Sequence, residues 1–135
     1  MTARGLVVVG AALIRDGKVL VAQRAHPLAL AGLWELPGGK VEPGEDEQAA
    51  LVRECREELG VEITLTGALA AEVPTMGVEG VLRTYVGTIT EGEPRAHEHQ
   101  GLRWLAADEL EAVAWLPSDV ALLPALAAVL AGSRP

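Results

Sequence analysis

The spacing of apolar and polar residues predicts a series of strands that begins with a hairpin. A continuous apolar run over residues 6–14 predicts a strand, and residues 19–23 predict its partner across the turn Asp16-Gly17. Residues 81–90 form the clearest later strand. Weaker segments predict strands over residues 61–66, 68–73 and the end of 98–105, a loop over 25–32, and a short helical turn over 108–112.

Helical spacing predicts two helices between and after these strands. Val52, Cys55 and Leu59 fall on one apolar stripe at about 100° per residue, and Gly60 follows as a helix stop. A second helix is predicted to start at residues 117–119 and to end near Leu130. Strands around two helices make an α+β fold, and we expect one domain over residues 1–135.

A glycine-rich loop leads into the first helix, whose polar side carries three glutamates. The loop, residues 37–44, contains two Pro-Gly pairs. Glu54, Glu57 and Glu58 lie within an arc of about 100° on the helix, and Glu54 and Glu58 repel each other at i,i+4 spacing. A solvated helix face is the ordinary explanation, but such a face would favour glutamate followed by lysine. Converging carboxylates beside a loop favour a site for Mg²⁺ or Mn²⁺.

The order of these residues resembles the signature of the Nudix hydrolases, G-x5-E-x7-R-E-U-x-E-E-x-G-U, where U is aliphatic. Every invariant position is matched, by Gly39, Glu45, Arg53, Glu54, Glu57, Glu58 and Gly60. Cys55 departs from the aliphatic type at the first U, where a buried cysteine serves as a small hydrophobe. The resemblance implies an α/β/α sandwich with a mixed sheet and a loop–helix catalytic motif.

The resemblance also implies roles for these residues. Glu57 and Glu58 would bind Mg²⁺, with Mn²⁺ as an alternative, and Glu54 would bind the metal or orient the attacking water. A backbone carbonyl near Gly39 would complete the metal's ligands, and Arg53 would orient the glutamates.

Several residues in or near the motif have alternative roles. Glu98 matches the catalytic glutamate that MutT-like members carry in a later loop, so either Glu98 or the motif glutamate would act as base. His97 and His99 would share a face of an extended segment, but solvated or substrate-edge histidines are favoured over a metal site. Lys40 either meets a phosphate or is solvated, and Glu45 supports the metal ligands rather than joining them.

Nearly the whole chain resembles the MutT-like nucleoside triphosphate pyrophosphohydrolases, and within them the branch that acts on CTP, dCTP and modified forms. Residues 23–24, 32–45 and 96–100 carry this resemblance, together with Trp104. It implies hydrolysis of a nucleoside triphosphate to monophosphate and pyrophosphate, with 8-oxo-dGTP as a further substrate and cleansing of the nucleotide pool, a form of DNA repair, as a role. An ADP-ribose pyrophosphatase, which Pro74 weakly suggests, and a non-catalytic nucleotide-binding module are the alternatives.

Three residues are candidates for binding the substrate outside the motif. Trp34, directly before the loop, either stacks on the nucleobase or packs in the core. Asp119 either accepts hydrogen bonds from the base edge or, like Ser118, caps the last helix. Arg24 is the third candidate.

Composition narrows the setting of this chemistry. The chain has 135 residues, a net charge of −8 and a pI near 4.8, so duplex nucleic acid is not expected as a partner. Its single cysteine excludes an internal disulfide and suits a reducing compartment. No apolar run is long enough to span a membrane, and we expect a cytoplasmic enzyme with a small-molecule nucleotide substrate, as a monomer or homodimer.

Overall fold

The computed structural model describes residues 6–75 and 80–132. The described residues form strands β1 (Leu6–Arg15), β2 (Lys18–Gln23), β3 (Trp34–Glu35), β4 (Gly38–Lys40), β5 (Glu62–Ala68), β6 (Val73–Pro74), β7 (Gly80–Glu91) and β8 (Gly101–Leu105). Their helices are α1 (Glu47–Leu59), α2 (Pro117–Val120) and α3 (Leu123–Gly132), with 3₁₀ turns η1 (Leu28–Leu30) and η2 (Ala107–Ala112). None of the helices in these two ranges is both long and apolar enough to cross a bilayer.

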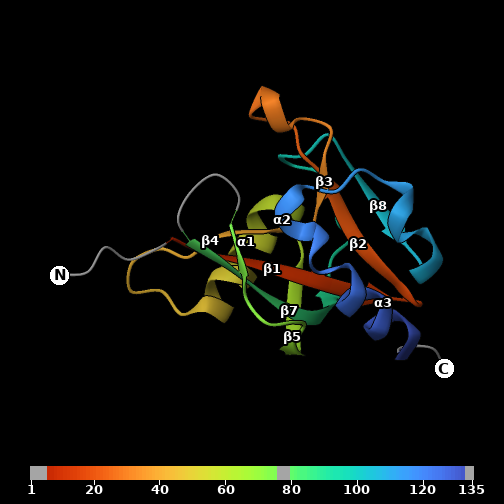
Figure 1. Cartoon of the computed structure of the whole chain (residues 1–135). Coiled ribbons are helices and arrows are strands. Elements are labelled where there is room, and N and C mark those ends of the chain that lie inside the picture. Colours follow the sequence, from red (N-terminus) through yellow and green to blue (C-terminus); the bar gives the residue numbers. More distant parts are fainter. Residues whose placement is uncertain (1–5, 76–79, 133–135) are drawn as a thin grey trace.

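Strand β1 is the centre of a mixed sheet (Figure 1). It pairs in parallel with β7 and antiparallel with β2 and β4. Its antiparallel partner changes along its length: Val8–Gly10 pair with β4, whereas Ile14 and Arg15 pair with β2. Strand β2 leads on to β3 and β8, and β7 leads on to β5 and β6. The prediction of a mixed sheet is confirmed.

The two faces of β1 pack into two separate cores, as expected for a strand buried on both sides. Val9 and Leu13 contact the cluster that holds Leu51, Cys55 and the rest of the apolar face of α1. Ala12, between them in sequence, belongs to the other cluster, which includes the leucines of α3. The sheet therefore lies between α1 and α3, which confirms the α+β class and the α/β/α layers.

The structure confirms the predicted first hairpin but shows that part of the predicted glycine-rich loop is a strand. The hairpin turn has φ of 54° at Asp16 and 76° at Gly17, the left-handed values that Asp-Gly turns favour. Residues 38 and 39, predicted as loop, instead belong to β4 and pair with β1. A Cβ on Gly38 would lie 1.9 Å from the carbonyl oxygen of Val9, so this glycine permits close strand contact rather than a turn.

Two later elements also differ from the prediction. Strand β5 continues through Gly67 with an irregular register, while residues 69–72 lie outside the strands. The single C-terminal helix that we predicted is two helices, α2 and α3. Pro124 explains the break, because a proline has no N–H and its ring clashes with the carbonyl four residues earlier, here that of Val120.

Candidate active site

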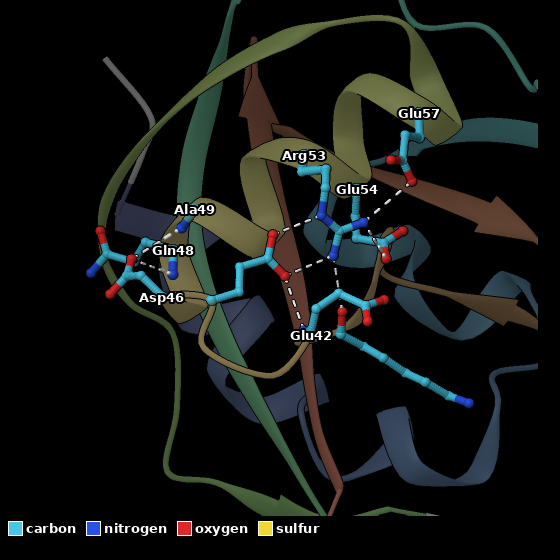
Figure 2. A network of polar contacts seen from close by, with 9 residues as sticks. Glu42, Asp46, Gln48, Ala49, Arg53, Glu54 and Glu57 are labelled. Atoms are coloured by element: carbon cyan, nitrogen blue, oxygen red, sulfur yellow. Dashed lines mark hydrogen bonds and ion pairs between the residues drawn. The ribbon is translucent and has the colours of Figure 1, made fainter.

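Helix α1 has strong signals at both ends. The carboxylate of Asp46 accepts hydrogen bonds from the N–H groups of Gln48 and Ala49, both at 3.1 Å, as an N-cap (Figure 2). Gly60 closes the helix in the left-handed conformation, and its N–H donates to the carbonyl of Arg56. The polar side chains of α1 are therefore held on a helix of defined length and register.

Arg53 is the centre of the polar network in Figure 2. Its guanidinium donates to both carboxylate oxygens of Glu45, at 2.7 and 2.9 Å. It also donates to Glu54 at 3.2 Å, to Glu57 at 3.3 Å and to the carbonyl of Lys40 at 3.2 Å. One side chain thus joins the loop to the glutamates of the helix, the geometry that an orienting role requires.

Glu45 contributes to the site through its ion pair with Arg53. The hydrogen bonds from Arg53 and from the N–H of Glu42 lower the pKa of the Glu45 carboxyl to about 2. Glu45 is therefore ionised and paired with Arg53, which fits the predicted supporting role.

Glu58 differs from the prediction of a carboxylate on the polar face. It is only 8% exposed, and its Oε1 accepts a hydrogen bond of 3.3 Å from the N–H of Gly38. Burial raises the pKa of Glu58 to about 9, with further contributions from the negative charges of Glu54 and Glu35. Burial likewise raises the pKa of Glu54. Glu54 and Glu58 are therefore neighbouring carboxyl groups that are partly shielded from water and whose negative charges repel each other.

Gly39 makes room for one of these carboxylates. A Cβ at Gly39 would lie 2.3 Å from Cδ of Glu54, closer than any real contact. The absence of a side chain therefore lets the Glu54 carboxylate lie against the backbone of β4. The motif glycine and the motif glutamate are in direct contact.

This donor set fits a divalent cation. Oxygen ligands suit Mg²⁺ or Mn²⁺, and a cation would relieve the repulsion between the buried carboxylates. In the described part of the chain, no three His, Cys, Asp or Glu side chains surround one point. The Glu57 side chain is about half exposed and pairs with Arg53 at 3.3 Å.

A cavity of about 380 Å³ lies beside Glu58, with residues of the sheet in its lining. We call the part of the cavity that is lined by Gly38, Gly39, Lys40, Glu58 and Glu98 the carboxylate end. The lining also includes Val8, Gly10, Leu36, Leu82 and Thr84, which we call the floor, and Arg24, Glu35, His99, Ser118 and Asp119, which we call the far end. The structure thus brings the predicted residues Arg24, Lys40, Glu98 and Asp119 to one cavity.

Asp119 lies at the far end and is not a helix cap. It is 4% exposed, and its Oδ2 accepts a hydrogen bond of 2.9 Å from the N–H of Leu36. Ser118 donates to Oδ1 at 3.3 Å, while the N-cap position of α2 belongs to Leu116 and has no side-chain bond. Burial raises the pKa of Asp119 to about 7. The capping alternative is therefore wrong for both Ser118 and Asp119.

Trp34 does not line the cavity. Its side chain packs against the core cluster on the α3 side of the sheet, and its backbone N–H donates to the carbonyl of Ala114 at 2.8 Å. The structure therefore supports core packing for Trp34. It does not support the alternative that Trp34 stacks on the nucleobase. Pro74, the residue that suggested an ADP-ribose enzyme, is exposed on β6 and does not line the cavity either.

Sequence reasoning missed two polar residues of the cavity wall, Glu35 and Thr84. Glu35 pairs with Arg24 at 3.0 Å and with Nε2 of His99 at 3.1 Å. Thr84 is 2% exposed, and its hydroxyl and Nδ1 of His99 are the buried side-chain atoms without a hydrogen-bond partner in the described residues. Glu35 lies within residues 32–45, one of the segments that carry the family resemblance. Thr84 lies in strand β7, where no sequence pattern marks it as a functional residue.

The two histidines beside Glu98 do not form a shared metal face. The segment is bent rather than extended. Nδ1 of His97 lies 3.2 Å from the carbonyl oxygen of Glu57, whereas His99 contacts Glu35. They point to two different elements, and Glu98 lies between them at the cavity.

A family model supports the assignment that the site suggests. The NUDIX domain model matches residues 5–128, so the chain belongs to the Nudix family. Members of this family generally use divalent metal ions.

Curated relatives cover nearly the full chain. A provisionally named 8-oxo-dGTP diphosphatase of Mycobacterium tuberculosis is 46% identical over 94% of this chain and 92% of its own length. The CTP pyrophosphohydrolase of Escherichia coli is 42% identical over 95% of both chains. Among solved structures, the Escherichia coli ORF135 protein is 40% identical over 95% of this chain and 92% of its own, with a TM-score of 0.77.

Proposed function

We propose that this protein hydrolyses ribo- or deoxyribonucleoside triphosphates to the monophosphate and pyrophosphate in the presence of Mg²⁺. The observation that carries this proposal is the cavity that is lined both by the buried carboxyl group of Glu58 on α1 and by the buried acid Asp119. One end suits a metal-bound polyphosphate and the other a nucleobase. The family membership and the names of both relatives support it.

At the carboxylate end, Glu54, Glu57 and Glu58 and the backbone carbonyl of Gly39 would hold Mg²⁺. The bound ion would neutralise phosphate oxygens and polarise water. Arg53 holds the loop and the glutamates in register through its five contacts. This network places the loop and the glutamates of the helix relative to one another before the substrate binds.

Two residues at this end face the substrate directly. Lys40 lines the cavity, where its ammonium would meet a phosphate. Glu98 lies at the same end, close enough to Glu58 for its charge to contribute to the raised pKa of that group. We assign to Glu98 the removal of a proton from the attacking water, with Glu54 as the alternative base.

At the other end, Asp119 would read the base edge and Arg24 would border it. An ionised Asp119 only accepts hydrogen bonds, so it favours a base that offers donors, such as the amino group of cytosine or the guanine edge. The relatives' names include both CTP and 8-oxo-dGTP. We therefore propose CTP, dCTP, their modified forms and 8-oxo-dGTP as the substrate group, and cleansing of the cytoplasmic nucleotide pool as the role.

A panel of nucleotides with Mg²⁺, scored by kcat/KM and by pyrophosphate release, tests the proposal. CTP, dCTP, 8-oxo-dGTP, UTP and ADP-ribose belong on it. We expect a donor-bearing triphosphate to give the highest kcat/KM and pyrophosphate to be a product. Faster cleavage of ADP-ribose would replace the triphosphate assignment, and nucleotide binding without turnover would indicate a binding module.

A further inference from the structure

The connection between β7 and β8, residues 92–100, carries Glu98 to the mouth of the cavity. Most of this segment is exposed, and it has no regular secondary structure of its own. A catalytic carboxylate on such a segment needs anchors, because a displacement of about 1 Å can cost a hundredfold in rate. The residues on either side of Glu98 show where these anchors are.

The first anchor is the C-terminal end of α1. The N–H of His97 donates to the carbonyl of Glu58 at 3.1 Å, and Nδ1 of His97 lies 3.2 Å from the carbonyl oxygen of Glu57. Arg95 N–H donates to the carbonyl of Leu59 at 3.0 Å. The last carbonyls of a helix have no partner inside it. The segment therefore attaches to the turn of α1 that carries two of the motif glutamates.

Gly60 makes this contact possible. A Cβ at Gly60 would lie 2.9 Å from Cε1 of His97, too close for a real contact. Gly60 thus has two structural tasks: it adopts the left-handed cap conformation, with φ of 72°, and it leaves room for the His97 ring.

The second anchor is Glu35 on β3. Nε2 of His99 lies 3.1 Å from Oε2 of Glu35, and the His99 side chain is only 7% exposed. Glu35 is itself held by Arg24, and the N–H of Gln100 donates to the carbonyl of Gln23 at 2.8 Å. Because a carboxylate oxygen only accepts hydrogen bonds, Nε2 of His99 is the donor in its contact with Glu35.

We propose that His97 and His99 are a pair of positioning residues that hold Glu98 at the carboxylate end of the cavity. His97 ties one side of Glu98 to α1, and His99 ties the other side to β3. Neither ring takes part in the reaction itself. This inference rests on the proposed function, since it concerns the placement of its base.

Conservative replacements distinguish the two hydrogen bonds. His97→Asn keeps a donor near the position of Nδ1, and His99→Gln keeps one near the position of Nε2. We expect His97→Ala and His99→Ala each to lower kcat about tenfold with KM changed less than about threefold. His97→Asn and His99→Gln should recover most of the lost rate, whereas the exchanged replacements His97→Gln and His99→Asn should recover less.

The decisive measurement repeats the alanine substitutions in a Glu98→Gln background. A residue that acts only through Glu98 has nothing left to position there, so kcat should not fall further. Glu93→Gln is the matched control. It lies in the same connection and breaks the pair with Arg15, at 3.1 Å, away from the cavity, so kcat should not change.

Amide hydrogen exchange in the metal-free protein gives a readout that needs no activity. Exchange at residues 95–100 should be about tenfold faster in each alanine variant than in the wild type, with unchanged exchange in the core of α1. Losses of kcat that add to that of Glu98→Gln, unchanged exchange, or a near wild-type rate for Glu98→Gln would each overturn the inference. If the wild-type protein cleaves no triphosphate, the proposed function fails, and the exchange data still decide whether the histidines anchor the segment.

Discussion

The two ends of the cavity are built in opposite ways. The carboxylate end comes almost entirely from one contiguous stretch, residues 38–60, with Glu98 as its one addition from a distant segment. The floor and the far end collect single residues from separate elements: Gly10 from β1, Thr84 from β7 and Asp119 from α2. The residues that we propose for the reaction are therefore close together in the sequence, while the surface that we propose for the base exists only after folding.

This difference has a physical origin. The proposed metal ligands on α1 keep their spacing from the helical repeat, and Arg53 joins them to the loop a few residues away. A base pocket needs walls on several sides, which a sheet and a helix from distant parts of the chain provide. We expect substitutions at the first end to abolish turnover and substitutions at the second to change selectivity.

The largest expected effect is at Glu58. Glu58→Gln keeps the shape of the side chain but removes the charge, and we expect kcat to fall at least about a hundredfold, the scale for losing one electrostatic stabiliser. Glu62→Gln is the control, because Glu62 pairs with Arg56 outside the cavity. Steady-state kinetics over a series of Mg²⁺ concentrations measure both. Near wild-type turnover of Glu58→Gln at limiting Mg²⁺ would remove Glu58 from the metal site.

The same residue predicts a pH dependence in the protein without metal. The pKa of Glu58 is raised from 4.5 to about 9 by burial, so the folded protein holds its proton more tightly than the unfolded chain does. The free energy of unfolding should therefore fall as the pH rises from 4.5 toward 9, by at least about 1.4 kcal/mol, the value of one pKa unit. Denaturant unfolding with a chelator measures this, and Glu58→Gln should flatten the curve. An equal slope in that variant would assign the effect to other groups.

The sequence predicted the carboxylate end well because its determinants are local. Helix α1, its stop at Gly60 and the neighbours of Arg53 follow from spacing and from the signature. What was missed there depends on tertiary packing. The burial of Glu58 and the pairing of Gly38 with β1 result from β4 lying against the sheet, which no local pattern indicates.

The far end was predicted only in part for the same reason. Asp119 was a candidate, but its bond to Leu36 joins residues that are distant in sequence. Trp34 follows an apolar segment and precedes the loop, so its sequence position gives no preference between pocket and core. The strand register decides, because Trp34 pairs with β2 and bonds to Ala114. Thr84 becomes part of the floor through the parallel register of β7 with β1.

At the far end, Asp119→Asn should change selectivity while turnover remains. The asparagine carbonyl keeps the hydrogen bond from Leu36, and its amide offers donors where Asp119 only accepts when ionised. We expect the ratio of kcat/KM for CTP to that for UTP to fall about tenfold, equivalent to about 1.4 kcal/mol. Mg²⁺ dependence should not change.

A second substitution of Asp119 and a control variant test whether the change in selectivity comes from the Asp119 side chain. Asp119→Ala should narrow the same ratio, but it leaves the Leu36 N–H without its partner, at a cost of about 1–3 kcal/mol in stability. Asp108→Asn, in η2 and outside the cavity lining, should leave the ratio unchanged. If the ratio survives both substitutions of Asp119, the base is read elsewhere, with Arg24 the next residue to test.

The smallest expected effect comes from the cavity floor, at Gly10. A Cβ there would lie 3.6 Å from Cγ2 of Thr84 and 3.7 Å from Leu36 and Leu82, which are ordinary packing distances. Gly10→Ala should therefore fold normally and gain up to about 1 kcal/mol from reduced backbone entropy in the unfolded chain. The added methyl group takes space from the floor near Asp119, so KM should rise about threefold with kcat unchanged, a cost of about 0.7 kcal/mol. Kinetics and thermal unfolding of the same preparation measure the two effects. A fall in kcat with KM unchanged would mean that the floor acts on the carboxylate end, and the division of the cavity into a reaction end and a base end would then fail.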